Sequence, residues 1–378
     1  MTDPSFWRGK KVFLTGHTGF KGAWTSLLLR RFGASVYGYA LPPVHPSSLF
    51  VAAKVADDVD QRFADIRDLG ALSDAVSEAR PDIIIHMAAQ ALVRPSYSEP
   101  VETFATNVMG TVHVLEAARR QPSVQAILIV TTDKCYENNG QQAAFREDDR
   151  LGGNDPYSNG KACAELVTDS YRRSFFGAAG AARIATARAG NVFGGGDWAR
   201  DRLVPDTMQA FLDGETLRIR NPNSVRPWQH VLDPVLGYLT LVERLVDDES
   251  FVGGWNFGPA PESEVSVRKV VEHLLALWGD DAQWTSDSGP HPHEAAYLKL
   301  DCDKARTRLN WTPRLDLVQG LGLTVDWYKA LQNGRNLRQV SLEQLDLVLD
   351  GAASEGALGW TSDLSRGQDA APNTKRSP

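Results

Sequence analysis

The chain has 378 residues, of which 42% are hydrophobic and 23% are charged. This is enough to bury one large core and a smaller lobe, so disorder of the whole chain is excluded. Its 47 acidic and 40 basic residues give a formal charge of −7, which argues against nucleic acid as the main partner, because nucleic-acid binders concentrate positive charge. One small anionic ligand remains compatible with this charge.

The cysteines and the N-terminus indicate the compartment. The chain has three cysteines, Cys135, Cys163 and Cys302, which is an odd number and includes no CxxC spacing. Neither a disulfide framework nor a zinc cluster is therefore expected. The N-terminal segment MTDPSFWRGKK has no apolar run before its basic residues, and no stretch of roughly 18 apolar residues follows. We therefore expect a soluble protein of the reducing cytoplasm, with no membrane segment.

Apolar runs alternate with amphipathic stretches through the first half of the chain. In chain order, the pattern predicts strand 11–15, helix 22–32, strand 34–40, strand 82–87, helix 100–121, strand 126–131, helix 156–176 and strand 184–188. The strand runs are continuously apolar, which suits strands buried on both faces. The sequence therefore predicts an α/β fold with a doubly wound, parallel, Rossmann-type sheet.

The composition changes beyond residue 190, where segments are rich in Gly, Pro, Trp and Arg. We interpret them as a smaller, mixed lobe over the carboxyl ends of the strands, where ligands bind in such sheets. The predicted division is a dinucleotide-binding domain of residues 1–188, to which 228–258 return, and a substrate-binding lobe of 189–227 and 259–333. Residues 334–378 form an extension, which we expect to be disordered beyond 351.

A glycine-rich segment, TGHTGFKG, joins the first predicted strand to the first helix. Its Gly16, Gly19 and Gly22 are typical of a loop that turns tightly and lets the backbone approach a dinucleotide pyrophosphate. His17 and Lys21 within it are either pyrophosphate contacts or solvated residues. The following VYGYALPP lacks both the usual ribose-binding carboxylate and an arginine for a 2′-phosphate. The choice of NAD over NADP therefore depends on the reaction.

Tyr157 and Lys161 form YxxxK and share one face of a predicted helix. A tyrosine that acts as a base needs its pKa moved from about 10 toward neutrality. Lys161, the helix N-terminus and a positive nicotinamide ring would each favour the phenolate. The segment TTDKCY, residues 131–136, follows a predicted strand and is expected to point into the ligand crevice.

These motifs, with HMAAQ, Asn107 and RAGNVFGGGDW, resemble the extended short-chain dehydrogenases/reductases of the nucleotide-sugar epimerase and dehydratase branch, over about residues 8–333. The resemblance implies NAD, a nucleotide-sugar substrate, a hydro-lyase reaction in deoxysugar (O-antigen type) biosynthesis and a homodimer built from the Asn107 and Tyr157 helices. The cofactor-binding residues it implies are Gly16, His17, Thr18, Gly19, Phe20, Lys21, Gly22, Asp65, Ile66, Ala88, Ala89, Gln90, Asn107, Tyr157 and Lys161. Asp65 and Ile66 have a helix cap as their alternative.

The resemblance also implies a division of catalytic roles. Tyr157, held by Lys161 and assisted by Thr132, would take the proton of the sugar 4-hydroxyl, and Asp133 would protonate the hydroxyl that leaves C6. Lys134 stands where dTDP-glucose dehydratases carry the Glu that removes the C5 proton. As a base it would need a pKa well below about 10.4, which neighbouring cations favour. A cofactor or structural contact is its alternative role.

A nucleotide diphosphate calls for arginines, whose planar forks bind phosphate oxygens in pairs. The resemblance places Asn191 and Arg226 on the diphosphate, and the further candidates are Arg202, Arg220, His230 and Tyr297. Each arginine has a solvated surface charge as its alternative. Trp228, Trp255 and Trp311 are interpreted as core residues. His291 and His293 have no carboxylate ligand pattern, and we expect no metal.

Two other functions compete with dehydration. A 4-epimerase or reductase of the same branch shares the Thr, Tyr and Lys set but needs no acid for a leaving hydroxyl, so Asp133 with Lys134 favours a dehydratase. A catalytically silent NAD-binding regulatory protein is the second alternative. The presence of Tyr157, Lys161 and Asp133 argues against it.

Overall fold

A computed structural model describes residues 2–140, 143–279, 282–287 and 298–351. Seven parallel strands form one sheet in the order β10-β6-β5-β4-β1-β2-β3. They are β1 (Lys11–Thr15), β2 (Ser35–Ala40), β3 (Val59–Phe63), β4 (Ile83–His86), β5 (Ala126–Val130), β6 (Arg183–Ala189) and β10 (Gly253–Phe257). The predicted doubly wound parallel sheet is confirmed.

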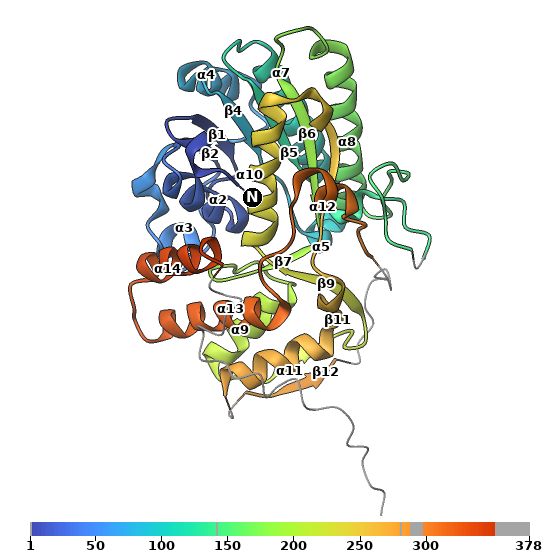
Figure 1. Cartoon of the computed structure of the whole chain (residues 1–378). Helices are drawn as coiled ribbons and strands as arrows, with labels where there is room; N and C mark the ends of the chain where they lie inside the picture. Colours follow the sequence, from blue (N-terminus) through green and yellow to red (C-terminus); the bar gives the residue numbers. More distant parts are fainter. Residues whose placement is uncertain (1, 141–142, 280–281, 288–297, 352–378) are drawn as a thin grey trace, which may run out of the picture.

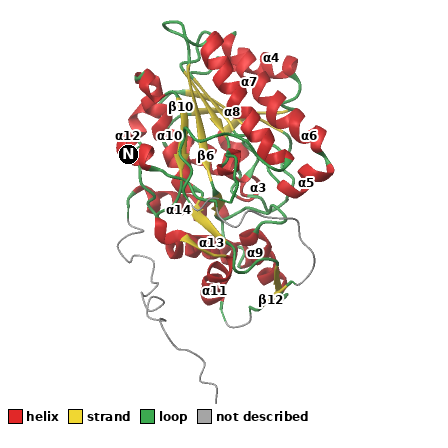
Figure 2. Ribbon diagram, turned by 90° about the vertical axis from the view of Figure 1, so that its right-hand side faces the viewer, coloured by secondary structure: helices red, strands yellow, loops and turns green. Residues whose placement is uncertain are grey.

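The helices cover both faces of this sheet and build much of the second lobe (Figures 1 and 2). The α-helices are α1 (Pro4–Trp7), α2 (Phe20–Arg31), α3 (Leu49–Ala52), α4 (Leu69–Ala79), α5 (Val93–Ser98), α6 (Pro100–Phe104), α7 (Gly110–Arg119), α8 (Pro156–Phe175), α9 (Leu203–Asp213), α10 (Leu232–Asp247), α11 (Val267–Trp278), α12 (Asp303–Leu309), α13 (Leu317–Gln332) and α14 (Leu337–Leu349). None of those in the described ranges combines the length and apolar character that crossing a bilayer demands.

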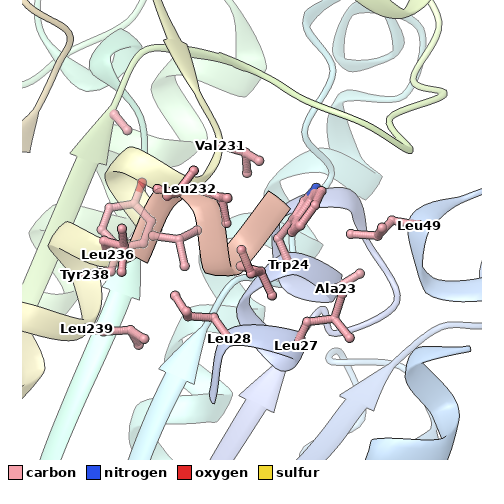
Figure 3. Close-up of a cluster of buried hydrophobic side chains, with 14 of the residues drawn as sticks. Ala23, Trp24, Leu27, Leu28, Leu49, Val231, Leu232, Leu236, Tyr238 and Leu239 are labelled. Atoms are coloured by element: carbon pink, nitrogen blue, oxygen red, sulfur yellow. The ribbon is translucent and has the colours of Figure 1, made fainter. Parts of the chain in front are cut away.

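Side chains of a single strand divide between two cores. Val12 and Leu14 of β1 belong to the cluster that contains α2 and α10, whereas Phe13 between them belongs to the cluster that contains α4 and α7. This alternation follows from the two-residue period of a strand. Figure 3 shows part of the first cluster, with side chains of α2 and α10 gathered together. Helices on both faces explain why the strands have continuously apolar sequences.

The second lobe contains two small sheets at the lower end of the view in Figure 1. Their orders are β11-β9-β7 and β12-β8, and their strands are β7 (Asn191–Phe193), β8 (Leu217–Ile219), β9 (Val225–His230), β11 (Glu264–Ser266) and β12 (Trp284–Ser286). The chain then returns to the large sheet, because β10 pairs with β6. Strand β9 keeps residues through His230 in the lobe sheet, slightly beyond the expected boundary at 228, and the division into domains stays a prediction.

The C-terminal extension begins with a packed helix. Leu337, Val340, Leu345 and Val348 of α14 are buried in the large core. The predicted disorder beyond residue 351 concerns residues that lie outside the described ranges. Trp228, Trp255 and Trp311 are each at most 6% exposed, which confirms their interpretation as core residues.

Candidate active site

The glycine loop connects β1 to α2 and has no room for side chains at two positions. Gly16 has a φ of +77°, and a Cβ there would lie 2.7 Å from the Ala88 backbone nitrogen. A Cβ on Gly22 would lie 2.1 Å from the Gly16 carbonyl oxygen. Gly19 is the N-cap of α2 and makes no side-chain capping hydrogen bond. The backbone N–H groups that begin α2 are therefore left without a side-chain cap, as an anion site requires.

His17 and Lys21 both turn inward, so neither is a solvated loop residue. The His17 ring is fully buried between the rings of Phe50 and Phe63, at centroid distances of 5.5 and 6.3 Å. It also fills the space over Gly38 of β2, where a Cβ would lie 2.5 Å from the ring. Burial lowers the pKa of His17 to about 4, so this ring is a neutral spacer between the loop and β2.

Lys21 points toward the catalytic residues. Its Nζ donates a hydrogen bond of 3.3 Å to the hydroxyl of Tyr238 on α10. Burial lowers the pKa of Lys21 to about 7, with smaller contributions from the cations Arg202 and Lys161, whereas Asp133 opposes the shift. Thr18 and Phe20, the other side chains of the loop, are partly exposed, and Thr18 donates to the Leu41 carbonyl at 2.9 Å.

The segment after β4 is fixed by buried polar contacts. Asn107 is 1% exposed, donates through Nδ2 to the Gln90 carbonyl at 3.0 Å and accepts from the Gln90 backbone N–H at 2.9 Å. It lies in a π-helical turn, Ala105–Met109, of the kind often found at functional sites. Ala88 and Ala89, which precede Gln90, are partly exposed beside the glycine loop. Asn107 therefore positions this segment through its backbone.

Asp65 and Ile66 follow β3 at the same edge of the sheet. The Asp65 carboxylate is ion-paired with Arg67 at 2.5 Å, and its backbone carbonyl accepts from the Tyr39 hydroxyl at 3.0 Å. The Ile66 side chain is 5% exposed and packs against Gly110. The N-cap of the next helix, α4, is Asp68. The helix-cap alternative for Asp65 and Ile66 is therefore wrong.

A short 3₁₀ turn, Asp133–Cys135, follows β5 and carries the predicted acid. Asp133 is 3% exposed, and its Oδ1 accepts a 3.0 Å hydrogen bond from the Thr132 hydroxyl. Burial raises the pKa of this carboxyl above its usual value, although the neighbouring Lys134 opposes the shift. Gly190 leaves room beside it, since a Cβ there would lie 3.0 Å from Asp133 Oδ2. Burial thus favours the protonated form that a general acid needs.

Tyr157 and Lys161 are held by the first turns of α8. Asp155 caps this helix by accepting from the Ser158 backbone N–H at 2.9 Å. Tyr157 is 9% exposed and Lys161 is 6% exposed, and the Lys161 Nζ donates to the Val130 carbonyl at 3.0 Å. Burial lowers the pKa of Lys161 to about 8. The lysine therefore bridges α8 to the end of β5.

In the chain without a cofactor, the pKa of Tyr157 is raised and not lowered as expected. Burial raises this pKa, and it outweighs the lowering by a hydrogen bond from Thr132 and by the charge of Arg202. Asp133 raises the pKa further. The cationic nicotinamide ring invoked for the shift is not part of the chain, so the phenol is neutral here.

The predicted substrate residues fall into two groups. Arg202 and Arg226 lie near the catalytic residues, since Arg202 acts on the pKa of Tyr157 and Arg226 on that of Asp133. Arg202 also forms a 3.6 Å ion pair with Asp197. Arg220 is paired with Asp201 at 3.2 Å. Asn191 is partly exposed at the start of β7.

His230 and Tyr297 are not placed at this site. His230 is 1% exposed, and its ring packs against those of Trp24 and Phe193 at 6.4 and 6.0 Å. The ring is therefore part of the core, and a contact of His230 with the substrate stays a prediction. Tyr297 lies outside the described residues, as do His291 and His293.

Comparisons with known proteins decide the family. A family model described as GDP-mannose 4,6 dehydratase matches residues 13–324. The chain belongs to the GDP-mannose 4,6 dehydratase family. CDP-glucose 4,6-dehydratase of Salmonella typhimurium is 49% identical over 342 residues, which are 89% of this chain and 95% of that protein. dTDP-glucose 4,6-dehydratase of Streptomyces antibioticus is 30% identical, over 74% of this chain and 79% of that protein.

Solved structures agree with this assignment at the level of the fold. The NAD-bound dTDP-glucose 4,6-dehydratase of Streptomyces venezuelae superposes with a TM-score of 0.71 at 24% identity, covering 86% of this chain and 98% of that one. UDP-glucuronic acid 4-epimerase of Bacillus cereus gives 0.73 at 21% identity, covering 85% and 99%. Dehydratases and epimerases therefore share this architecture.

Two residues of this family member escaped the sequence analysis. Tyr238, the partner of Lys21, lies within α10 in a segment with no local motif, so only the fold could reveal it. Glu165 continues the YxxxK spacing by four more residues, on the same face of α8, and this spacing could have identified it.

Proposed function

We propose that the chain is an NAD-dependent CDP-glucose 4,6-dehydratase, which converts CDP-glucose to CDP-4-keto-6-deoxyglucose and water. The observation that carries the proposal is the 49% identity to the Salmonella enzyme along 95% of that enzyme. The buried cluster of Asp133, Tyr157 and Lys161 supports it, because an acid beside the tyrosine is what dehydration requires and epimerisation does not. The reaction belongs to deoxysugar biosynthesis.

The residues present fit NAD. The N-terminus of α2 has no side-chain cap, and a Cβ at Gly16 or Gly22 would collide with the surrounding backbone, so the loop presents bare backbone to a pyrophosphate. Gly19 would lie against the phosphates, while Ala88 and Gln90 would face the nicotinamide end. NAD would supply the acceptor for the hydride from C4 and the donor for its return to C6. Dinucleotide-bound relatives of the same fold support this cofactor.

Tyr157 is the proposed base for the 4-hydroxyl proton. Its hydrogen bond with Thr132 and the charge of Arg202 favour the phenolate. The Lys161 ammonium, fixed on the Val130 carbonyl, adds a nearby positive charge on the same helix. These groups oppose the desolvation of Tyr157, and the positive nicotinamide ring of bound NAD would add to them, so that Tyr157 can reach the phenolate form and take the 4-hydroxyl proton.

Asp133 and Lys134 are proposed for the elimination of water. Formation of the C4 ketone acidifies the C5 hydrogen, and Lys134, in its neutral amine form, is the proposed acceptor of that proton. Asp133, whose pKa is raised by burial in the direction that favours the protonated form, is the proposed donor of the proton to the hydroxyl that leaves C6. Both side chains come from one short turn after β5, so acid and base reach adjacent carbon atoms.

The substrate diphosphate is proposed to bind Arg226 and Asn191, with Arg202 nearby. The Arg202 side chain is 34% exposed and its partner Asp197 is buried, so the guanidinium is held at the site with part of its surface open to phosphate oxygens. Arg220 is the more remote candidate because it is paired with Asp201.

We further propose a homodimer in the cytoplasm. Val101, Met109 and Leu166 are 81%, 47% and 58% exposed on α6, the π turn and α8. Apolar side chains gathered on neighbouring helices favour an interface with a second copy. Leu166→Glu is expected to give monomers in sedimentation analysis, and persistence of a dimer would contradict this interface.

The test of function is incubation with CDP-glucose and, separately, dTDP-glucose. We expect a 4-keto-6-deoxy product from CDP-glucose and much slower turnover of dTDP-glucose. CDP-glucose carrying deuterium at C4 should give product with deuterium at C6 of the same molecule, without a stoichiometric demand for NAD. Washout of the deuterium, or a 4-epimer as product, would refute the proposal.

A further inference from the structure

Glu165 is a buried carboxylate on the helix that carries Tyr157 and Lys161. Its side chain is 3% exposed, and four donors satisfy its two oxygens. Oε1 accepts from the Thr131 hydroxyl and from Arg188 Nε at 3.0 Å. Oε2 accepts from the Thr186 hydroxyl at 2.6 Å and from Arg188 Nη2 at 2.8 Å. These donors and the arginine charge lower the pKa of Glu165 despite its burial.

Arg188, on β6, connects this carboxylate to the catalytic turn. Its side chain is 5% exposed, and Nη1 donates to the Tyr136 hydroxyl at 2.7 Å and to the Glu147 carbonyl at 3.0 Å. Tyr136 directly follows the Asp133–Cys135 turn. Gly254 of β10 provides the space for the guanidinium, since a Cβ there would lie 2.6 Å from Arg188 Nη2.

The hydrogen bonds continue from Tyr136 to Asn256 on β10 and from there to two backbone carbonyls. The Tyr136 hydroxyl donates to Asn256 Oδ1 at 2.7 Å, and Asn256 Nδ2 donates to the carbonyls of Phe145 and Asp301 at 2.9 and 3.1 Å. A buried network with every member bonded rigidifies its surroundings, whereas loss of one member is costly.

We propose that Glu165, paired with Arg188, is a positioning residue for the catalytic Lys161 and Thr132: it holds the end of β5 against α8 and places a carboxylate one turn along the helix from Lys161. Thr131, which Glu165 bonds, is adjacent to Thr132, and the Val130 carbonyl on the same strand end accepts from Lys161. The inference rests on the proposed function, in which the Lys161 charge assists Tyr157.

The charges around Lys161 explain why one carboxylate matters. Four titratable groups interact electrostatically with Lys161. They are Glu165 on its own helix, Cys135 on the turn, His86 on β4 and Lys21 on α2. Burial lowers the pKa of His86 to about 3 and raises that of Cys135, so both are neutral near pH 7. Among these four groups, Glu165 is the one anion, and it raises the pKa of Lys161.

The experiment compares Glu165→Gln with the double variant Glu165→Gln/Arg188→Met, in the full chain. The double variant leaves no unpaired charge in the core, so we expect it to fold. Asp169→Asn is the matched control, because Asp169 lies one turn further along α8 and pairs with Arg173 at 2.8 Å on the surface, 42% exposed. All variants are compared by thermal melting before assay.

Two readouts distinguish positioning from mere packing. The alkaline limb of the kcat/KM profile is expected to move to lower pH by about one unit in Glu165→Gln, the size of effect that a close charge has. The shift should be smaller in the double variant, which also removes the Arg188 cation, and absent in Asp169→Asn. The pKa of Lys161, measured by the pH dependence of trace acetylation and mass spectrometry without substrate, should fall by the same amount.

The inference would be overturned if both Glu165 variants kept the wild-type alkaline limb of the kcat/KM profile and the wild-type Lys161 pKa, even with lower melting temperatures. The acetylation measurement needs no turnover, so it separates this inference from the proposed function. A wild-type chain that turns over no nucleotide sugar would contradict the function alone, and a shifted Lys161 pKa would still support the positioning role.

Discussion

The catalytic region and the substrate-facing region differ in how their side chains are held. Asp133, Tyr157 and Lys161 are each less than 10% exposed, and a fully bonded network lies behind them. On the substrate side, the side chains of Arg202 and Arg220 are 34% and 25% exposed and form ion pairs with nearby aspartates. The first region is therefore preformed, whereas the second can rearrange when a diphosphate arrives.

This difference predicts different kinetic consequences. Arg220 and Asp201 are 25% and 42% exposed, and an exposed ion pair stabilises a fold by only about 0–1 kcal/mol, so Arg220 can leave its partner at little cost. Asp197, the partner of Arg202, is only 4% exposed, so Arg202 is held more firmly. Substitutions in the preformed region should lower kcat, whereas substitutions in the substrate-facing region should raise KM. Each prediction below tests one side of this contrast.

The largest effect is expected for Tyr157→Phe. The base for the 4-hydroxyl proton is lost, while the ring and its packing remain, so kcat should fall by about 10⁴ with KM nearly unchanged. Rapid mixing with CDP-glucose should show no rise in reduced-nicotinamide absorbance. A variant that keeps a substantial fraction of wild-type kcat would contradict the proposed base.

Asp133→Asn should separate oxidation from elimination. The amide keeps the shape of the carboxyl group but cannot donate its proton to the leaving hydroxyl, so kcat should fall by about 10² to 10³. Oxidation at C4 should survive, and reduced-nicotinamide absorbance should rise on mixing and decay slowly. Normal substrate binding with no such rise would show that Asp133 acts before elimination.

A smaller effect, and one on KM, is expected for Arg226→Met. Loss of a charged hydrogen bond to phosphate costs about 1.5–3 kcal/mol, so KM for CDP-glucose should rise about 10-fold to 100-fold. Removal of this cation takes away a charge that lowers the Asp133 pKa, which favours the protonated acid, so kcat should change little. The control is Arg218→Met, whose side chain is exposed on β8. Equal changes in KM for Arg226→Met and Arg218→Met would contradict the proposed difference between the two regions.

The same contrast explains what could be predicted from the sequence. The strands, the glycine loop and the Tyr157–Lys161 pair are local patterns, because a strand has period two, a loop needs glycine at fixed positions and a helix turns every 3.6 residues. The inward turn of His17 depends instead on Phe50 and Phe63, which are distant in sequence. The partnership of Lys21 with Tyr238 is also a contact between distant segments.

The substrate side was less predictable for a related reason. His230 is flanked by arginine- and proline-rich sequence that resembles a binding loop, but β9 places its ring in the core against Trp24. The Tyr157 pKa was predicted from nearby cations, whereas burial dominates it in the folded chain. Burial is a property of the whole fold, and motif spacing does not report it.

The smallest predicted effect tests whether the preformed region extends along α10 to the N-terminus. Glu243, on the same helix as Tyr238, accepts from the Trp7 indole at 2.6 Å and from the Asp3 backbone N–H at 3.0 Å. Burial raises the pKa of Glu243 to about 7, above an unfolded value of about 4.3. The folded chain thus binds an extra proton between these pH values. Its stabilising contribution is complete below about pH 4 and is lost as pH rises through 7.

Glu243 should therefore lower the free energy of unfolding by about 2 kcal/mol between pH 5 and pH 7. Glu243→Gln removes the titration and keeps an acceptor for Trp7, so urea unfolding of this variant should depend less on pH than that of wild type. Glu249→Gln, at an exposed position just beyond α10, should retain the wild-type dependence. Parallel curves for wild type and Glu243→Gln would mean that Glu243 is ionised in the folded chain throughout this range. In that case the two donors, the Trp7 indole and the Asp3 backbone N–H, determine its charge rather than burial, as hydrogen-bond donors do at Glu165.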